Sequence, residues 1–211
     1  DEIDLVEDMV WPGDANADSR ADNIDLLSIG LYHSETGVSR TLTGNNWAPY
    51  VSTNWLRQQY TGVNFKHADC NGDGTINDDD TLAIIQNFNQ FHNFNHRINT
   101  TPSSAIINDL FFIMPHPKAV YAFGDTIFAE IWLGRNNKPE MTLYGIAFNI
   151  STVAACIKPG SFKINLRTNW LADQSNSLCL DEERETQGIA YAAIVRKDHI
   201  SGTGKGKIGE F

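Results

Sequence analysis

The chain has 211 residues, of which 41% are hydrophobic and 20% charged, and its formal net charge is -10. This composition supports a packed core, and the length allows one large domain or two small ones. The acidic balance argues against nucleic-acid binding, which requires a basic surface, and the longest uncharged apolar run, Leu110 to Met114, is too short to span a bilayer. We therefore expect no nucleic-acid partner and no membrane span. Because the chain opens on Asp1 without a signal-peptide pattern, we expect a processed product or a fragment.

Residues 1–10 are expected to form an N-terminal extension or a strand. The acidic residues then gather in two segments, loop 1 (residues 14–25) and loop 2 (residues 69–80). Both loops place Asp, Asn and Asp at positions 1, 3 and 5 and Asp at position 12, which is the spacing of an EF-hand calcium loop. Alternate residues of such a tight loop direct their oxygens towards the Ca²⁺ ion. A solvated acidic loop is the alternative, but two matches in one chain favour two calcium sites.

The expected ligands are side-chain oxygens at positions 1, 3, 5, 9 and 12 and the backbone carbonyl at position 7 of each loop. They are Asp14, Asn16, Asp18, Arg20, Asp22 and Asp25 in loop 1, and Asp69, Asn71, Asp73, Thr75, Asn77 and Asp80 in loop 2. Gly74 at position 6 of loop 2 permits the sharp turn, whereas Ser19 at that position is expected to weaken loop 1. Apolar residues at helical spacing follow both loops, so we expect a helix to begin at the last ligand of each.

A calcium loop followed directly by a helix, with Asp at position 12, resembles the type I dockerin module of bacterial extracellular proteins. The resemblance is carried by residues 13–27 and 69–82. It implies a small α-helical module over residues 11–100 that binds two Ca²⁺ ions. The loops lie further apart than in that family, because an insert, residues 31–66, separates them. The aromatic residues of the insert are expected to pack a local core, with a sugar-binding platform as the alternative; they are Trp47, Tyr50, Trp55, Tyr60 and Phe65.

From about residue 107 the pattern changes to an alternation of apolar and polar residues, which is typical of half-buried strands. Strands are expected at residues 110–114, 126–133, 143–150, 162–167, 189–196 and 207–211. Many short strands separated by turn residues indicate an antiparallel β-sandwich over residues 107–211, after a linker at residues 101–106. The whole chain is therefore expected to be an α+β protein of two domains.

The second half resembles the cohesin-like domains of secreted bacterial proteins, on the stretches 124–126, 143–148 and 199–211. Together with the two loops, it resembles large surface proteins of Bacteroidota, which are commonly exported by the type IX system. The family's sandwich continues past the point where this sequence ends. The resemblance therefore implies a sandwich that is incomplete at its C-terminus, either because the polypeptide is longer or because a neighbour supplies a strand.

Three residues of the second half are candidates for covalent modification. A disulfide between Cys156 and Cys179 is plausible in an exported protein, and two separate thiols fit the sequence equally well. Thr126, within Asp125-Thr126-Ile127, resembles the acceptor of the O-glycosylation motif of exported Bacteroidota proteins, and a plain Thr at the start of a strand is the alternative.

The sequence contains no nucleophile elbow, phosphate loop or dinucleotide motif. We expect a non-catalytic structural or adhesive segment of an extracellular bacterial surface protein. The resemblance to both halves of a binding pair implies that its partners are other copies of itself or other cohesin- or dockerin-bearing surface proteins, joined head to tail in fibres. The alternative is a carbohydrate-binding accessory region of a larger extracellular enzyme, which predicts that Trp47, Trp55 or Trp170 is exposed on a flat face. A hydrolase that uses an acid pair such as Asp181 with Glu183 is a third hypothesis.

Overall fold

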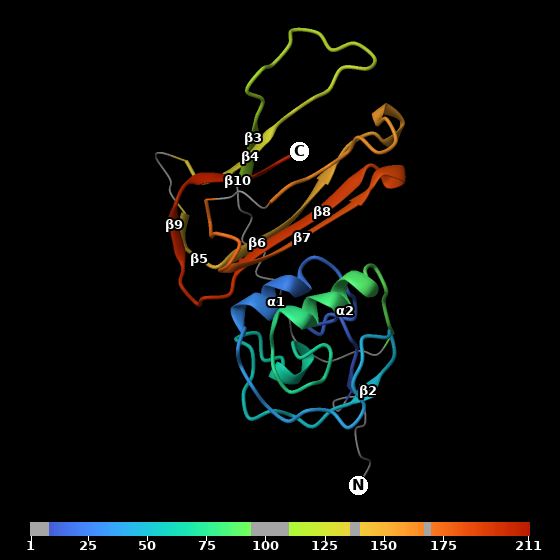
Figure 1. Ribbon diagram of the computed structural model, residues 1–211, viewed down its shortest axis with the longest axis vertical. Helices are drawn as coiled ribbons and strands as arrows, with labels where there is room; N and C mark the ends of the chain where they lie inside the picture. The colour runs from blue at the N-terminus through green and yellow to red at the C-terminus, as the bar shows by residue number, and fades with distance from the viewer. Residues whose placement is uncertain (1–8, 94–109, 136–139, 167–169) are drawn as a thin grey trace. The chain divides into compact units, whose positions relative to one another are not determined.

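The computed structural model describes residues 9–93, 110–135, 140–166 and 170–211, and the chain divides into two compact units. Unit 1 is Asp1–Ser104 and unit 2 is Ala105–Phe211. The described residues form mostly short antiparallel strands, with two short α-helices (Figure 1). No described helix has the length and apolarity that crossing a membrane requires. The expected linker at residues 101–106 and residues 1–8 of the expected N-terminal extension lie outside the described residues.

Unit 1 contains both helices, and each follows one of the acidic loops (Figure 1). Its elements are β1 (Met9–Val10), α1 (Asp25–Leu31), β2 (Tyr50–Val51), the 3-10 helices η1 (Phe65–His67) and η2 (Asp78–Asp80), and α2 (Thr81–Gln86). The apolar spacing that predicts these helices also defines their inner faces, because Leu26, Ile29 and Ile84 are fully buried. The helices therefore begin where the sequence places them, at or directly after position 12 of each loop.

Unit 1 contains a repeat whose two halves are 55 residues apart, and each loop is hydrogen-bonded to the segment that follows the helix of the other half. In loop 1, Ala21 exchanges backbone hydrogen bonds of 3.1 and 2.7 Å with residues 89–90, which follow α2. In loop 2, Ile76 exchanges bonds of 2.9 and 2.7 Å with residues 34–35, which follow α1. Each loop is therefore closed by the chain that leaves the other loop's helix, so the two halves of unit 1 fold as one body.

The insert between α1 and η1 runs along loop 2. The backbone N–H groups of Gly37 and Arg40 donate to the carbonyl oxygens of Gly74 and Gly72, at 3.0 and 2.9 Å. The aromatic side chains of the insert differ in exposure: Trp55 and Phe65 are buried, Trp47 and Tyr50 are half-buried, and Tyr60 is exposed. Two of the five are therefore buried as a local core requires, and Trp47 packs against Trp11 with ring centroids 5.1 Å apart.

Unit 2 is built from eight antiparallel strands in the described residues (Figure 1). They are β3 (Leu110–Ile113), β4 (Glu130–Leu133), β5 (Glu140–Leu143), β6 (Gly145–Ser151), β7 (Ser177–Arg184), β8 (Ile189–Arg196), β9 (Gly202–Gly204) and β10 (Gly206–Glu210), with 3-10 helices η3 (Ala154–Cys156) and η4 (Glu185–Gln187). Two three-stranded sheets have the orders β10-β4-β3 and β6-β8-β7, and β5 pairs with β9.

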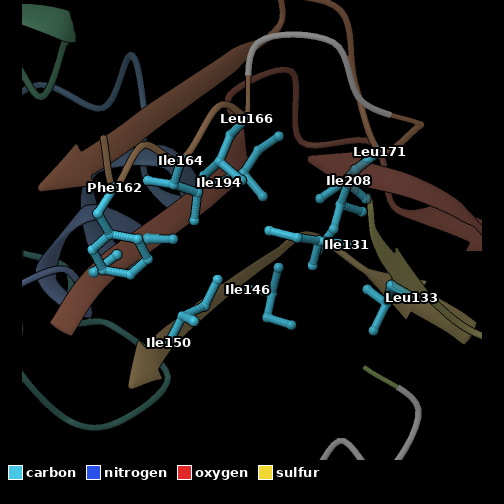
Figure 2. Close-up of a cluster of buried hydrophobic side chains, with 12 residues drawn as sticks. Ile131, Leu133, Ile146, Ile150, Phe162, Ile164, Leu166, Leu171, Ile194 and Ile208 are labelled. Atoms are coloured by element: carbon cyan, nitrogen blue, oxygen red, sulfur yellow. The ribbon is translucent and has the colours of Figure 1, made fainter. Parts of the chain in front are cut away.

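The two three-stranded sheets share one apolar core (Figure 2). Ile131 of β4 and Ile208 of β10 come from one sheet, and Ile146 of β6 and Ile194 of β8 come from the other. All four are less than 5% exposed. Because alternate residues of a strand face the same side, each sheet covers this core with one face, as the alternation in the sequence predicts.

Residues 162–166 are not the strand that their alternation predicts. Phe162 and Ile164 are buried, but their backbone N–H groups donate at 3.0 Å to the carboxylates of Glu185 and Glu183. These carboxylates provide the acceptors that a neighbouring strand would otherwise provide. The segment therefore contributes apolar side chains to the core while making only an isolated bridge, between Asn165 and Glu210.

The candidate disulfide is not formed in the structure, where Cys156 and Cys179 are two separate free thiols, which is the alternative that the sequence left open. Cys156 lies in η3, which packs against η4 beyond the far end of β7, whereas Cys179 is near the start of that strand. The six residues from Cys179 to Glu185 span about 20 Å of strand, far more than a disulfide can bridge. Thr126 is exposed in the connection between β3 and β4, before the strand that begins at Glu130.

Candidate metal centre

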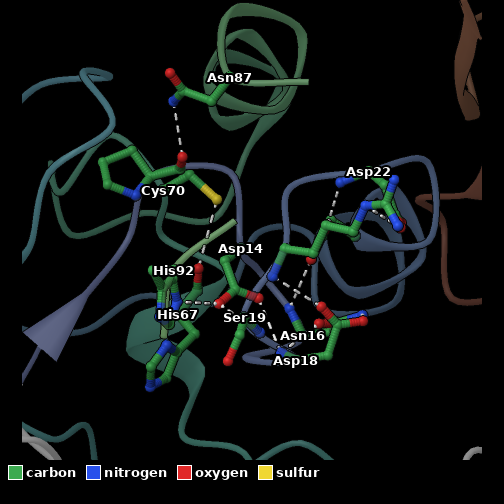
Figure 3. A network of polar contacts seen from close by, with 12 residues as sticks. Asp14, Asn16, Asp18, Ser19, Asp22, His67, Cys70, Asn87 and His92 are labelled. Carbon is green, nitrogen blue, oxygen red and sulfur yellow. Dashed lines mark hydrogen bonds and ion pairs between the residues drawn. The ribbon is translucent and has the colours of Figure 1, made fainter. Parts of the chain in front are cut away.

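Loop 1 folds around the carboxylates at its first and last positions. Asp25 is fully buried, and its two oxygens accept the backbone N–H groups of Asn16 at 3.0 Å and Asp22 at 2.8 Å. Asp14 is 1% exposed and accepts the N–H group of Asp18 at 2.9 Å (Figure 3). These bonds close residues 14–25 into a compact loop, which contains the side chains at positions 1, 3, 5, 9 and 12.

Loop 2 repeats this arrangement. Asp80 is fully buried and accepts the backbone N–H groups of Asn71 at 3.0 Å and Asn77 at 2.8 Å, and Asp69 accepts that of Gly74 at 3.1 Å. Positions 3 and 9 of both loops therefore donate to position 12 at the same distances, whereas Oδ1 of position 1 accepts from position 5 in loop 1 and from position 4 in loop 2. A fold that occurs twice, on sequences that share little except the ligand pattern, indicates that the pattern itself determines the loop.

Ser19 adopts the backbone conformation that favours glycine. Its φ is 80°, against 93° for Gly74 at the equivalent position, and its N–H group donates to Asp14 at 3.1 Å. A non-glycine residue in this left-handed region costs about 1 kcal/mol or more. Loop 1 therefore has the same kind of backbone conformation as loop 2 at position 6, and Ser19, in place of a glycine, strains the backbone locally.

Burial raises the pKa of all four end carboxylates. The pKa of Asp80 rises to about 7 and that of Asp69 to about 6, and burial is the main cause in both. The pKa of Asp25 is raised well above its usual value by burial and then by the neighbouring charges of Asp14, Asp18 and Asp22. A carboxylate out of water among like charges is stable only if it is protonated or meets a cation.

The remaining expected ligands lie nearer the solvent. Asn16 and Asn71 are half-buried, and Asp18 and Asp73 are exposed. Within the described ranges, no three His, Cys, Asp or Glu side chains converge into a group able to hold a metal. The ligand set of such a loop also includes amide and backbone carbonyl oxygens, here from Asn16, Asn71 and position 7. All of these donors are hard oxygens, a set that fits Ca²⁺ better than zinc or copper.

Each loop has a different neighbour from a distant part of the chain. His92 places Nε2 3.0 Å from Oδ2 of Asp14 (Figure 3). Its ring stacks on Trp11 with centroids 4.5 Å apart. Arg40 lies against loop 2 and donates from Nη2 to the carbonyl oxygen of Cys70 at 2.6 Å. The sequence pattern identifies neither residue, because they follow no ligand spacing and reach the loops only through the fold.

The carbohydrate-binding hypothesis depends on exposed tryptophan rings, and the hydrolase hypothesis depends on an acid pair that includes Glu183. Trp55 is 6% exposed, and Trp47 and Trp170 are half-buried, so none of the three rings is fully open to solvent. Glu183 binds the backbone N–H group of Ile164 at 3.0 Å, which is a structural role.

Comparison with known proteins gives no match: no protein-family model, curated protein or solved structure matches the chain.

Proposed function

We propose that this chain is a non-catalytic, calcium-stabilised structural or adhesive segment of an extracellular bacterial surface protein. Loop 1 and loop 2 each hold one Ca²⁺ ion and thereby stabilise unit 1 as a dockerin-like module. Unit 2 serves as a cohesin-like β-sandwich. Contacts between unit 1 of one chain and unit 2 of another, or with other proteins that carry such modules, join the chains head to tail.

The observation that carries the calcium proposal is the burial of paired carboxylates in two matching loops. Asp14, Asp25, Asp69 and Asp80 are each at most 1% exposed, and each closes its loop through backbone N–H groups. A divalent cation between the ends of each loop compensates the charge that burial makes unfavourable. Extracellular modules commonly bind Ca²⁺ with dissociation constants of about 10⁻⁴ to 10⁻³ M, and we expect the two loops to fall in this range.

An open sheet edge of unit 2 supports the assembly proposal. In the described residues, β3 has a strand on one side only. The unpaired edge of β3 adjoins exposed apolar side chains, among them Phe112, Ile113 and Met114. An edge of this composition favours pairing with another chain.

Calcium titration of the metal-stripped protein by isothermal calorimetry tests the metal sites. We expect two Ca²⁺ ions per chain, one of which is lost in Asp25→Asn and the other in Asp80→Asn. Asp79→Asn is the matched control, because Asp79 is an exposed acid of loop 2 outside the ligand positions. A wild-type protein that binds no Ca²⁺ would contradict the proposal, as would equal losses in all three variants.

Sedimentation velocity with and without EDTA tests the assembly. We expect large species at high protein concentration in calcium and their loss on chelation. A chain that binds calcium but remains strictly monomeric under these conditions would remove the head-to-tail part of the proposal and leave the metal sites in place.

A further inference from the structure

The two loops differ in the charge that surrounds them. Loop 1 has carboxylates at four ligand positions, whereas loop 2 has three, because Asn77 occupies the position of Asp22. The buried end of loop 1 meets the imidazole of His92, and an exposed arginine, Arg20, lies 3.7 Å from Asp22. Loop 2 meets a guanidinium, Arg40, which carries a permanent charge.

Arg40 is held against the backbone of loop 2. It is 5% exposed, and its N–H group and Nη2 bond to the carbonyl oxygens of Gly72 and Cys70 at 2.9 and 2.6 Å. The guanidinium lies over the ring of Tyr50, with Cζ 4.9 Å from the centroid. Gly72 is required beneath it, since a Cβ at that position would collide with Nε. The side chain is therefore fixed over positions 2 to 4 of the loop.

The hydrogen bonds of Arg40 leave part of its charge uncompensated. Nε and Nη1 are buried and have no hydrogen-bond partner in the part of the chain that the structure describes. Among the charges that act on Arg40, that of Asp69 in loop 2 is the largest, and Arg40 is in turn the largest influence that lowers the pKa of Asp69. A buried guanidinium with spare donors is costly unless carboxylates lie close to it. Its position is explained if it offsets the charge of the loop.

We propose that Arg40 is a built-in counter-cation of loop 2, which keeps that loop folded without metal and weakens its affinity for Ca²⁺, so that loop 1 fills first. This inference rests on the calcium sites proposed above. Loop 1 has the greater ligand charge, and its buried Asp14 meets a histidine, His92, where the backbone of loop 2 meets the buried guanidinium of Arg40. Affinity rises with the number of charged ligands. The order of filling is therefore opposite to the one that Ser19 alone would predict.

The proposal predicts effects of opposite sign from one substitution, Arg40→Met. Without metal, unit 1 should melt at a lower temperature, because the carboxylates of loop 2 lose their counter-charge. In the Asp25→Asn background, where loop 2 is the remaining site, Ca²⁺ should bind about tenfold more tightly, since a like charge next to the ion is gone. A purely structural arginine would lower stability and calcium affinity together.

Arg57→Met is the matched control, because it removes the same charge from the same insert. Arg57 is exposed and pairs with Glu35 on the surface. We expect its metal-free melting temperature and its calcium affinity in the same background to stay close to those of the parent protein. An equal tightening in Arg57→Met would overturn the proposal, because it would show that net charge alone sets the affinity.

A second measurement keeps the test decisive if Arg40→Met does not fold. The wild-type calorimetric titration should show two unequal steps, of which Asp25→Asn removes the tighter and Asp80→Asn the weaker. If the tighter step belongs to loop 2, or if Arg40→Met weakens calcium binding, the role assigned to Arg40 is wrong while the calcium sites stand. If the wild type binds no calcium, the proposed function itself fails.

Discussion

The two units of this chain are stabilised by different physics. Apart from Ser177, every buried polar or charged residue among those described lies in unit 1. The charged and titratable ones are Asp14, Asp25, Arg40, Lys66, His67, Asp69, Asp80 and His92. Unit 2 instead buries Ile, Leu, Val, Phe and Ala between two sheets. A fold that buries charge depends on what compensates it, whereas a fold that buries hydrocarbon depends mainly on packing.

Removal of metal should have the largest effect, and it should act on one unit only. In about 10 mM calcium, which is about 100 times a dissociation constant of about 10⁻⁴ M, a filled site adds about 2.7 kcal/mol, so chelation should lower the melting temperature of unit 1 by more than about 10 °C. Unit 2 contains none of the expected metal ligands, so its melting temperature should not change on chelation. Differential scanning calorimetry with and without EDTA measures both transitions, and a single transition that ignores EDTA would break the comparison.

A cavity in the apolar core should affect the other unit. Ile194 lies on the central strand β8 and is fully buried, so Ile194→Ala should destabilise unit 2 by about 2–5 kcal/mol. The calcium-dependent transition should not move. As a control, Ile200→Ala removes an equal side chain that is 60% exposed and should have little effect. A shift of both transitions in Ile194→Ala would show that the units unfold together.

The metal-free protein should lose stability in unit 1 as the pH rises. The folded-state pKa values of Asp80 and Asp69, about 7 and about 6, lie above the usual value of 3.8. The folded state therefore binds protons that the unfolded state has released, and this stabilisation, complete below about pH 4, is lost as the pH rises to about 7. Saturating calcium should reverse the trend, because the ion competes with protons for the same oxygens. Chemical denaturation from pH 4 to pH 8, with and without calcium, measures both slopes; a flat metal-free profile would contradict the prediction.

A smaller effect is expected at a buried amide that ties the insert to loop 1. Gln59 accepts from the hydroxyl of Ser28 at 3.0 Å and donates to the carbonyl oxygen of Ala15 at 2.8 Å. Gln59→Met keeps the volume but leaves these partners unsatisfied, at a cost of about 1–2 kcal/mol in unit 1. Gln58→Met, at the exposed neighbouring position, should be neutral. Urea denaturation of the calcium-loaded variants would show the difference, and equal stabilities would mean that water satisfies both groups.

The features that the sequence predicts are those with local causes. The spacing of Asp and Asn within each loop, and the apolar residues after it, determine hydrogen bonds and helices over a dozen residues. The alternation at residues 145–151 and 189–196 likewise predicts β6 and β8. β7 is missed because its second half, Asp181 to Arg184, is charged and hides the alternation.

The features that the sequence misses depend on residues far apart in the chain. His92 meets Asp14 across 78 residues, and Arg40 meets Cys70 across 30 residues. No local rule places these pairs, because they are brought together by the exchange of chain segments between the two loops. The candidate disulfide is left open by the sequence for a related reason, since the strand that separates its two cysteines was not predicted.

The pairing of loop 1 with the end of unit 1 also determines how the unit responds to mechanical load. The N–H group of His92 donates to the carbonyl oxygen of Ser19 at 3.0 Å, and residues 89–90 pair with Ala21 behind it. Since the chain enters and leaves on the same side of this pairing, tension on the two ends, once β1 has left β2, breaks the bonds one after another, as in a zipper. Loop 2 pairs with residues in the interior of the unit and does not carry this tension. A pull on the chain would therefore open the first loop, together with any ion that it binds, before the second loop.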